Sequence, residues 1–177
     1  MKNKIIKLIL IAVAFMYGIE DPVRYVSQPA VNSFSLVIDR SGSMSGNAMN
    51  DAKKAVKHFI DEMRDSDQAN IIAFDRKVSV VANMGASKSN LKSAVGKIHP
   101  GGATALYDAI AKAATHLYNE SGARIIVFIT DGDDTGSKFR LRDIKNMNLA
   151  EGIFIYGIGL GNVNKRALDE LIGATGG

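Results

Sequence analysis

The sequence has no cysteine among its 177 residues. Disulfide bonds and metal sites built on thiolates are therefore excluded. Export and residence in the cytoplasm are both compatible with this absence, so only the N-terminus bears on the compartment. The rest of the composition, 46% hydrophobic and 23% charged, is that of an ordinary globular protein. A chain of this length is expected to form one domain with a short appendage.

Acidic residues are missing before Glu20, whereas Lys2, Lys4 and Lys7 all lie in that stretch. These three lysines account for three of the four net positive charges of the chain. The remainder is close to neutral, and its basic residues do not cluster with aromatic residues. Charge therefore gives no indication of a nucleic-acid partner.

The basic start leads into the apolar run Leu8 to Met16. This run is short for a membrane span, which needs about 20 residues, and its length is typical of a signal-peptide core. We expect residues 1–18 to form a signal peptide or an N-terminal membrane anchor, and residues 19–32 to form a linker. Both forms place the protein outside the cytoplasm, either secreted or anchored to a membrane. A buried N-terminal helix is the alternative, which the interruption by Lys7 disfavours.

From Ser33 onward, short apolar runs alternate with segments whose apolar residues recur every three or four positions. The first pattern predicts strands and the second helices. Such alternation predicts a doubly wound α/β domain over residues 33–177, with helices on both faces of a mostly parallel sheet. Strands are predicted at 34–38, 70–74, 78–81, 124–129 and 153–158, and helices at 49–63, 91–98, 106–117, 139–149 and from 162 or 164 onward.

One strand is expected to run antiparallel at the edge of this sheet. Only Asp75, Arg76 and Lys77 separate the strand at 70–74 from the strand at 78–81. Parallel neighbours need a crossover of a dozen or more residues, so this link indicates a hairpin.

Three loops rich in side-chain oxygen are expected to meet at the carboxyl edge of the sheet, where ligands bind in such folds. The first strand runs into Asp39-Arg40-Ser41-Gly42-Ser43, and the fourth into Thr130-Asp131-Gly132. Gly101-Gly102-Ala103-Thr104 lies between them, just before a helix. We expect the first loop to be extended, so that the alternating Asp39, Ser41 and Ser43 can all point the same way.

The chemistry of these loops indicates a hard divalent cation. Their polar side chains are hydroxyls and carboxylates, without imidazole or thiolate, and such donors select Mg²⁺, Mn²⁺ or Ca²⁺ over Zn²⁺. Two carboxylates balance the charge of the ion, and hydroxyls add neutral ligands. The candidate metal residues are Asp39, Ser41, Ser43, Thr104 and Asp131, with Mg²⁺ as the first choice of metal.

These motifs resemble those of von Willebrand factor type A domains. DRSGSM at 39–44 resembles the family's DxSxS signature, GGATALYDAI at 101–110 resembles the loop that supplies its threonine, and ITDGDD at 129–134 resembles its TDG loop. The resemblance covers about residues 33–177 and rests on three separated motifs in the right order. Family domains commonly continue past a TGG such as that at 175–177 into a final strand and helix, and we expect either that the chain is a fragment or that these elements are lacking.

The resemblance implies a metal-ion-dependent adhesion site at the same five residues. In the family, the two serines bind the metal directly, and the threonine binds it directly or through water. The aspartates act largely through water, and a carboxylate of the ligand completes the coordination. The resemblance therefore implies a protein partner that presents an acidic group.

Other acids near these loops have plainer interpretations. Asp133 and Asp134 are expected to be solvated loop residues, and Asp108 to lie in the first turn of a helix, where its charge suits the helix dipole. Asp39, Ser41 and Ser43 could in turn form only a turn and a helix cap, since Asp and Ser are common in both roles. The agreement with Thr104 and Asp131 disfavours that interpretation.

We interpret the chain as a divalent-metal-dependent protein-binding module, used in adhesion or interaction, and not as an enzyme. The predicted cluster offers no positioned His, Lys or Cys as a base or nucleophile. One alternative is a hydrolase of phosphate esters in which Mg²⁺ acts as a Lewis acid. Another is a cytoplasmic assembly subunit that docks on an ATPase, which the N-terminal segment argues against.

Overall fold

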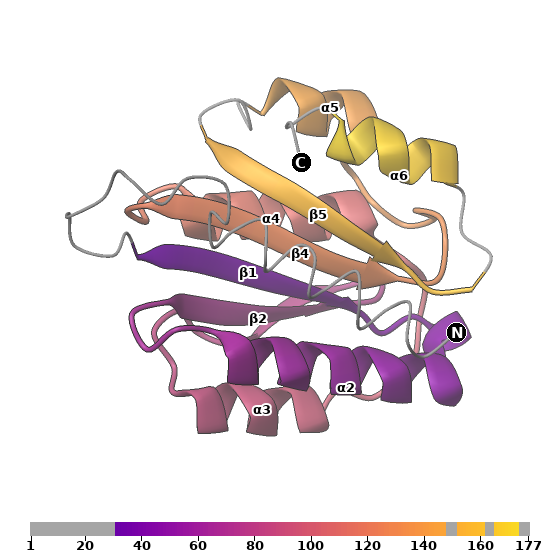
Figure 1. Ribbon diagram of the computed structural model, residues 1–177. Helices are drawn as coiled ribbons and strands as arrows, with labels where there is room; N and C mark the ends of the chain where they lie inside the picture. Colours follow the sequence, from indigo (N-terminus) through magenta and orange to yellow (C-terminus); the bar gives the residue numbers. More distant parts are fainter. Residues whose placement is uncertain (1–30, 148–151, 162–164, 174–177) are drawn as a thin grey trace.

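The computed structural model describes residues 31–147, 152–161 and 165–173 (Figure 1). Within them, one sheet has the strand order β3-β2-β1-β4-β5. Its strands are β1 (Asn32–Asp39), β2 (Gln68–Phe74), β3 (Val78–Ala82), β4 (Ala123–Thr130) and β5 (Ile153–Gly159). All neighbouring pairs are parallel except β2 and β3. The predicted doubly wound sheet with one antiparallel edge strand is confirmed.

Helices cover both faces of the sheet. On one face lie α2 (Asn47–Glu62) and α3 (Lys88–Gly96), and on the other α4 (Leu106–Leu117), α5 (Leu141–Asn146) and α6 (Lys165–Ile172) (Figure 1). The central strand β1 is buried at every position because both of its faces are covered. Phe34 and Leu36 pack toward α2, while Val37 packs toward α4.

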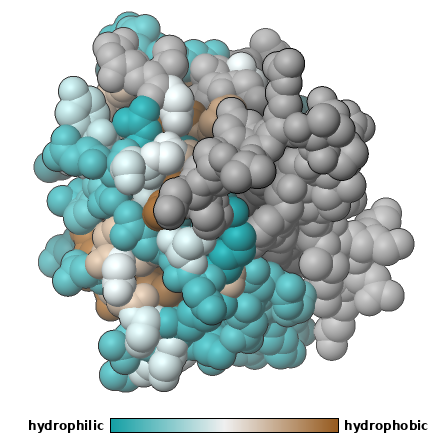
Figure 2. Space-filling view, turned by 60° about the vertical axis from the view of Figure 1, so that its left-hand side comes forward, coloured by the Kyte–Doolittle hydropathy of each residue, from teal (hydrophilic) through white to brown (hydrophobic). Residues whose placement is uncertain are grey.

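The apolar residues thus form two core layers, one on each side of the sheet. Phe34 of β1 meets Phe59 of α2 edge to face, with ring centroids 5.1 Å apart. On the outside, hydrophilic side chains predominate in the view of Figure 2, with small hydrophobic patches between them. This layering leaves the loops at the two ends of the sheet as the places where polar side chains gather.

Several predicted boundaries shift. β1 begins at Asn32, one residue inside the predicted linker, because Asn32 pairs with Ala123 and its N–H bonds the Asp67 carboxylate at 3.2 Å. The cap of α3 is Ser87, whose hydroxyl accepts a hydrogen bond from Asn90 N–H at 3.3 Å. The helix predicted over 139–149 is wrong in length, since α5 ends at Asn146.

Two predictions lie outside the described residues. One is the signal or anchor segment at 1–18 with most of its linker, and the other is the start of the last helix at 162–164. In the part of the chain that the structure describes, no helix combines the length and apolar character needed to cross a membrane.

Candidate metal centre

The three predicted loops meet at the carboxyl edge of the sheet. β1 and β4 are parallel neighbours, so Asp39 at the end of one lies beside Thr130 at the end of the other. Ser43 donates a hydrogen bond from Oγ to Oδ1 of Asp131 at 2.7 Å, across 88 residues of sequence. The Oγ atoms of Ser41 and Ser43 are 3.0 Å apart. Ser41, Ser43 and Asp131 therefore form one connected group of side-chain oxygen atoms.

The first loop is not extended as predicted. Gly42–Met44 form the short 3-10 helix η1, in which Met44 N–H bonds Ser41 C=O at 3.1 Å. The turn forms here because the side chain of Met44 is fully buried in the core, which fixes the position of the loop. Ser41 and Ser43 are still neighbours, but through a tight turn and not through the alternation of a strand.

Asp39 is completely buried. Its Oδ1 accepts the N–H of Ser41 at 2.7 Å, and its Oδ2 accepts the hydroxyl of Thr130 at 2.5 Å. Burial raises the pKa of Asp39, because removal from water disfavours the charged form. The hydrogen bonds from Thr130 and Ser41 oppose this rise in pKa, and the nearby Asp131 carboxylate adds to it. A positive charge at this edge would stabilise the ionised carboxylate.

Thr104 lies in a loop that is joined by backbone hydrogen bonds to both of the others. On one side, Gly101 N–H bonds Arg40 C=O at 2.7 Å, and Gly42 N–H bonds Gly102 C=O at 3.0 Å. On the other side, the C=O of Thr104 accepts the N–H groups of Thr135 and Gly136, both at 2.9 Å. Thr104 is itself 6% exposed. Its position relative to Ser41 and Asp131 is therefore set by the main chain.

Sequence reasoning missed an ion pair next to this site, which we name the Arg40–Asp75 brace. Nη2 of Arg40 pairs with Oδ2 of Asp75 at 3.0 Å, and Asp75 C=O accepts the N–H of Ala105 at 2.9 Å. Gly102 has φ of +92°, and a Cβ there would lie 3.0 Å from Asp75. The pattern contained a signal, because Asp75 directly follows β2 just as Asp39 ends β1.

Asp108 of α4 and Asp134 of the β4–α5 loop hold that loop in shape. Asp108 accepts the N–H groups of Lys138 and Phe139 at 2.9 and 3.0 Å, which is a more specific role than the predicted dipole interaction. Asp134 accepts the N–H of Tyr107 at 3.3 Å and is half-buried, so the prediction of a solvated acid is wrong for it. Asp133 is exposed, as predicted.

The donor set fits a hard cation better than a soft one. Among the described residues, no three His, Cys, Asp or Glu side chains gather where they could hold a metal. The cluster instead combines two carboxylates with serine and threonine hydroxyls, which leaves positions for water and for an outside ligand. Mg²⁺ keeps several waters and binds through one or two carboxylates, so this chemistry suits it.

A doubly wound α/β domain with a hydroxyl–carboxylate cluster at its carboxyl edge is the class of protein that these observations define. The model of the von Willebrand factor type A domain matches residues 35–177, and the chain belongs to that family.

The chain is also similar to named proteins and to solved structures. Inter-alpha-trypsin inhibitor heavy chain H2 of Mesocricetus auratus is 31% identical over 149 residues, which cover 75% of this chain and 16% of that protein. Heavy chain H3 of Mus musculus is 31% identical over 152 residues, or 76% of this chain and 17% of that protein. The chain thus spans less than a fifth of these relatives. A solved structure of a von Willebrand factor type A protein from Catenulispora acidiphila has a TM-score of 0.75 at 25% identity, covering 84% of this chain and 38% of that one.

Proposed function

We propose that the chain is a non-enzymatic protein-binding module that captures an acidic group of a partner through a divalent metal, Mg²⁺ in the first place and Mn²⁺ or Ca²⁺ as alternatives. Asp39, Ser41, Ser43, Thr104 and Asp131 would hold the ion. The observation that carries the proposal is the contact between Ser43 and Asp131 at 2.7 Å, with Ser41 3.0 Å away. When bound, the metal supplies a positive centre that attracts a carboxylate.

The residues of the proposed site would contribute to metal binding in different ways. The exposed Ser43 and the half-buried Asp131 lie toward solvent, where an ion and a partner can reach them. Asp39 lies beneath and supplies negative charge, held in orientation by Ser41 and Thr130. Burial of that charge strengthens its attraction for a cation, because the local dielectric is low.

The hydrogen bonds of the cluster support binding over hydrolysis. Within the described residues, no His or Lys side chain bonds the hydroxyl of Ser41 or Ser43, and the Ser43 hydroxyl donates to the Asp131 carboxylate, which the metal would engage. His99, the histidine closest in sequence to the Thr104 loop, is exposed. This arrangement favours the holding of an acidic group over the cleavage of a bond.

Calorimetric titration of the full chain with Mg²⁺ and Mn²⁺ tests the proposal. We expect saturable binding to one site, and loss of that binding in Asp39→Ala. A pull-down with Mg²⁺ or chelator then tests whether a bound protein depends on the metal. Equal affinity of wild type and Asp39→Ala for Mg²⁺ would falsify the assignment, because it would show that the ion binds elsewhere.

We also propose that the protein acts outside the cytoplasm, secreted or anchored through residues 1–18. The three lysines followed by the run Leu8 to Met16 support this proposal. Residues 1–30 are fused to a reporter that is active only after export, and a matched fusion has Leu10→Arg in the run. We expect signal from the first fusion alone, and silence of both contradicts export.

A further inference from the structure

The charged side chains that point outward around the proposed metal site are mostly basic. Four exposed basic residues lie on two segments next to it, and we name this set the basic rim: Arg76, Lys77, Lys138 and Arg140. Asp133 is the one exposed acid in the loops that form the site, among the residues that the structure describes.

The remaining acids at this edge are engaged within the protein. Asp75 pairs with Arg40, Asp108 accepts two backbone N–H groups of the β4–α5 loop, and Asp134 accepts the N–H of Tyr107. Asp75 is thus paired with a cation, and the carboxylates of Asp108 and Asp134 are directed toward the protein. The basic side chains of the rim, by contrast, are exposed to an approaching molecule.

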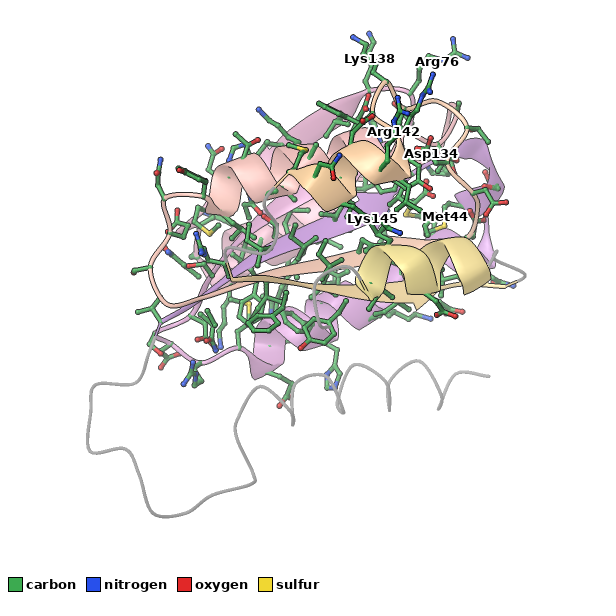
Figure 3. All side chains as sticks on the ribbon, turned by 90° about the horizontal axis from the view of Figure 1, so that it is seen from above. Met44, Arg76, Asp134, Lys138, Arg142 and Lys145 are labelled. Atoms are coloured by element: carbon green, nitrogen blue, oxygen red, sulfur yellow. The ribbon has the colours of Figure 1, made fainter. Side chains whose placement is uncertain are left out.

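The two segments of the rim flank the start of α4. Asp75, next to Arg76 and Lys77, bonds Ala105 just before the helix, and Lys138 N–H bonds Asp108 in its first turn. Figure 3 shows Arg76 and Lys138 at the same end of the molecule, with both side chains extending away from the ribbon. No ion pair holds Arg76, Lys77 or Lys138 among the described residues.

We propose that the partner presents an acidic segment with several carboxylates, one taken at the metal and the others attracted by the basic rim. This inference rests on the proposed function and names the chemistry of its partner. Charge complementarity of this kind raises the association rate and selects between partners more than it adds raw affinity. Screening over about 8 Å at physiological salt confines the effect to charges close to the rim.

A nucleic acid also carries negative charge, but the rim suits it less well. Single-stranded nucleic acids stack on a series of aromatic side chains along a basic groove. Phe139, 41% exposed, is the only large aromatic side chain that stands out on this rim among the described residues. The neighbouring oxygen cluster also suits a carboxylate held through a metal. Nucleic-acid binding is therefore an outcome of the test below.

The test uses the full chain and fluorescein-labelled peptides, read by anisotropy in Mg²⁺. One peptide carries a single aspartate followed by a run of glutamates, and its matched control has glutamines in place of the glutamates. A labelled single-stranded oligonucleotide is the third probe. The variants are Arg76→Glu/Lys138→Glu for the rim and Lys54→Glu/Lys112→Glu for the same charge change on the exposed faces of α2 and α4.

We expect the glutamate peptide to bind roughly tenfold tighter than its control, a difference of about 1.4 kcal/mol. The rim variant should lose this advantage and keep wild-type Mg²⁺ affinity, while the α2/α4 variant should keep both.

If wild type binds Mg²⁺ normally and has equal affinity for the two peptides, the inference is overturned and the proposed function is not. The same holds if the α2/α4 variant loses as much affinity for the glutamate peptide as the rim variant. Metal-independent binding of the oligonucleotide above that of the peptide overturns it in favour of nucleic acid. Absence of Mg²⁺ binding in wild type overturns the proposed function instead.

Discussion

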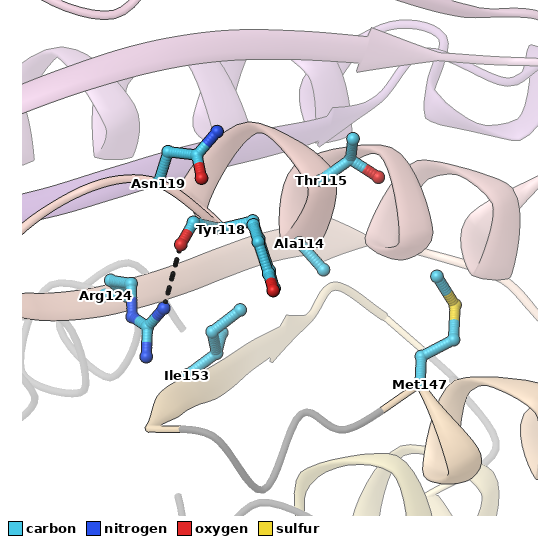
Figure 4. Close-up of a pocket in the computed structure, with 7 residues that line it drawn as sticks. All are labelled: Ala114, Thr115, Tyr118, Asn119, Arg124, Met147 and Ile153. Atoms are coloured by element: carbon cyan, nitrogen blue, oxygen red, sulfur yellow. Dashed lines mark hydrogen bonds between the residues drawn. The ribbon is translucent and has the colours of Figure 1, made fainter.

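At the carboxyl end of the sheet, oxygen atoms from loops far apart in sequence lie within hydrogen-bonding distance of one another. At the amino end, α4, α5 and the starts of β4 and β5 surround a cavity of about 360 Å³ (Figure 4). It is lined by Ala114, Thr115, Tyr118, Asn119, Arg124, Met147 and Ile153.

The two ends differ in the chemistry of the side chains that they bring together. In the cavity, Arg124 donates a hydrogen bond to the backbone C=O of Tyr118 at 3.1 Å, so this side chain supports the chain turn between α4 and β4. The other lining groups are mixed in kind, and those drawn in Figure 4 do not converge on one point. At the carboxyl end, by contrast, like groups converge. Side chains of one chemical kind that converge indicate a binding site better than the volume of a pocket does.

The largest expected effect is that of Asp39→Ala. It removes one of the two charges that would balance the metal, and it also removes the acceptor that orients Ser41 and Thr130. We expect Mg²⁺ affinity to fall by about 100-fold or more, the upper end of what loss of a supporting group costs. Calorimetry measures the loss, and an affinity within a factor of three of wild type contradicts it.

Asp39→Asn separates the effect of this residue on metal binding from its effect on stability, because the variant keeps the shape of the side chain and removes its charge. Since burial disfavours the charged carboxylate, we expect the thermal midpoint of Asp39→Asn in chelator to equal or exceed that of wild type. With saturating Mg²⁺, wild type should gain stability by mass action and the variant should not. A midpoint well below that of wild type in chelator would show that the charge stabilises the fold.

Ser43→Ala should have a smaller effect, because it removes one neutral oxygen and leaves both carboxylates in place. We expect Mg²⁺ affinity to fall about tenfold, or about 1.4 kcal/mol.

Thr104→Ala should reduce capture of an acidic peptide more than binding of the metal itself. Parallel titrations of metal and peptide check both variants, and an unchanged Ser43→Ala removes this residue from the site.

The Arg40–Asp75 brace should contribute less again. Its side chains are 29% and 18% exposed, and ion pairs of this kind are worth about 0.2–1 kcal/mol. We expect Arg40→Met and Asp75→Asn each to lower Mg²⁺ affinity about threefold, and the double variant to be no worse than either. Additive losses in that double-mutant cycle would show that the two residues act separately.

The smallest effect is expected at the amino end. Asn119→Ala changes an exposed side chain of the cavity, far along the fold from the carboxyl edge. We expect Mg²⁺ affinity and peptide binding to stay at wild-type values. A loss as large as that of Ser43→Ala would mean that the two ends are coupled, and the comparison between them would have to be revised.

The sequence by itself determined the order of the elements and the face that each one buries. Unbroken apolar runs such as that ending at Asp39 predict buried strands, and the three-residue link at 75–77 predicts the antiparallel edge, because both depend on local periodicity and chain length. The meeting of the three loops followed from one general rule about the ends of parallel strands.

Tertiary structure alone decided the geometry of the site. The 3-10 turn at Gly42–Met44 depends on burial of Met44, and the complete burial of Asp39 depends on the neighbouring strand end at Thr130. The Arg40–Asp75 brace likewise joins residues on adjacent strand ends. Each of these features comes from contacts between segments distant in the chain, which periodicity within one segment does not encode.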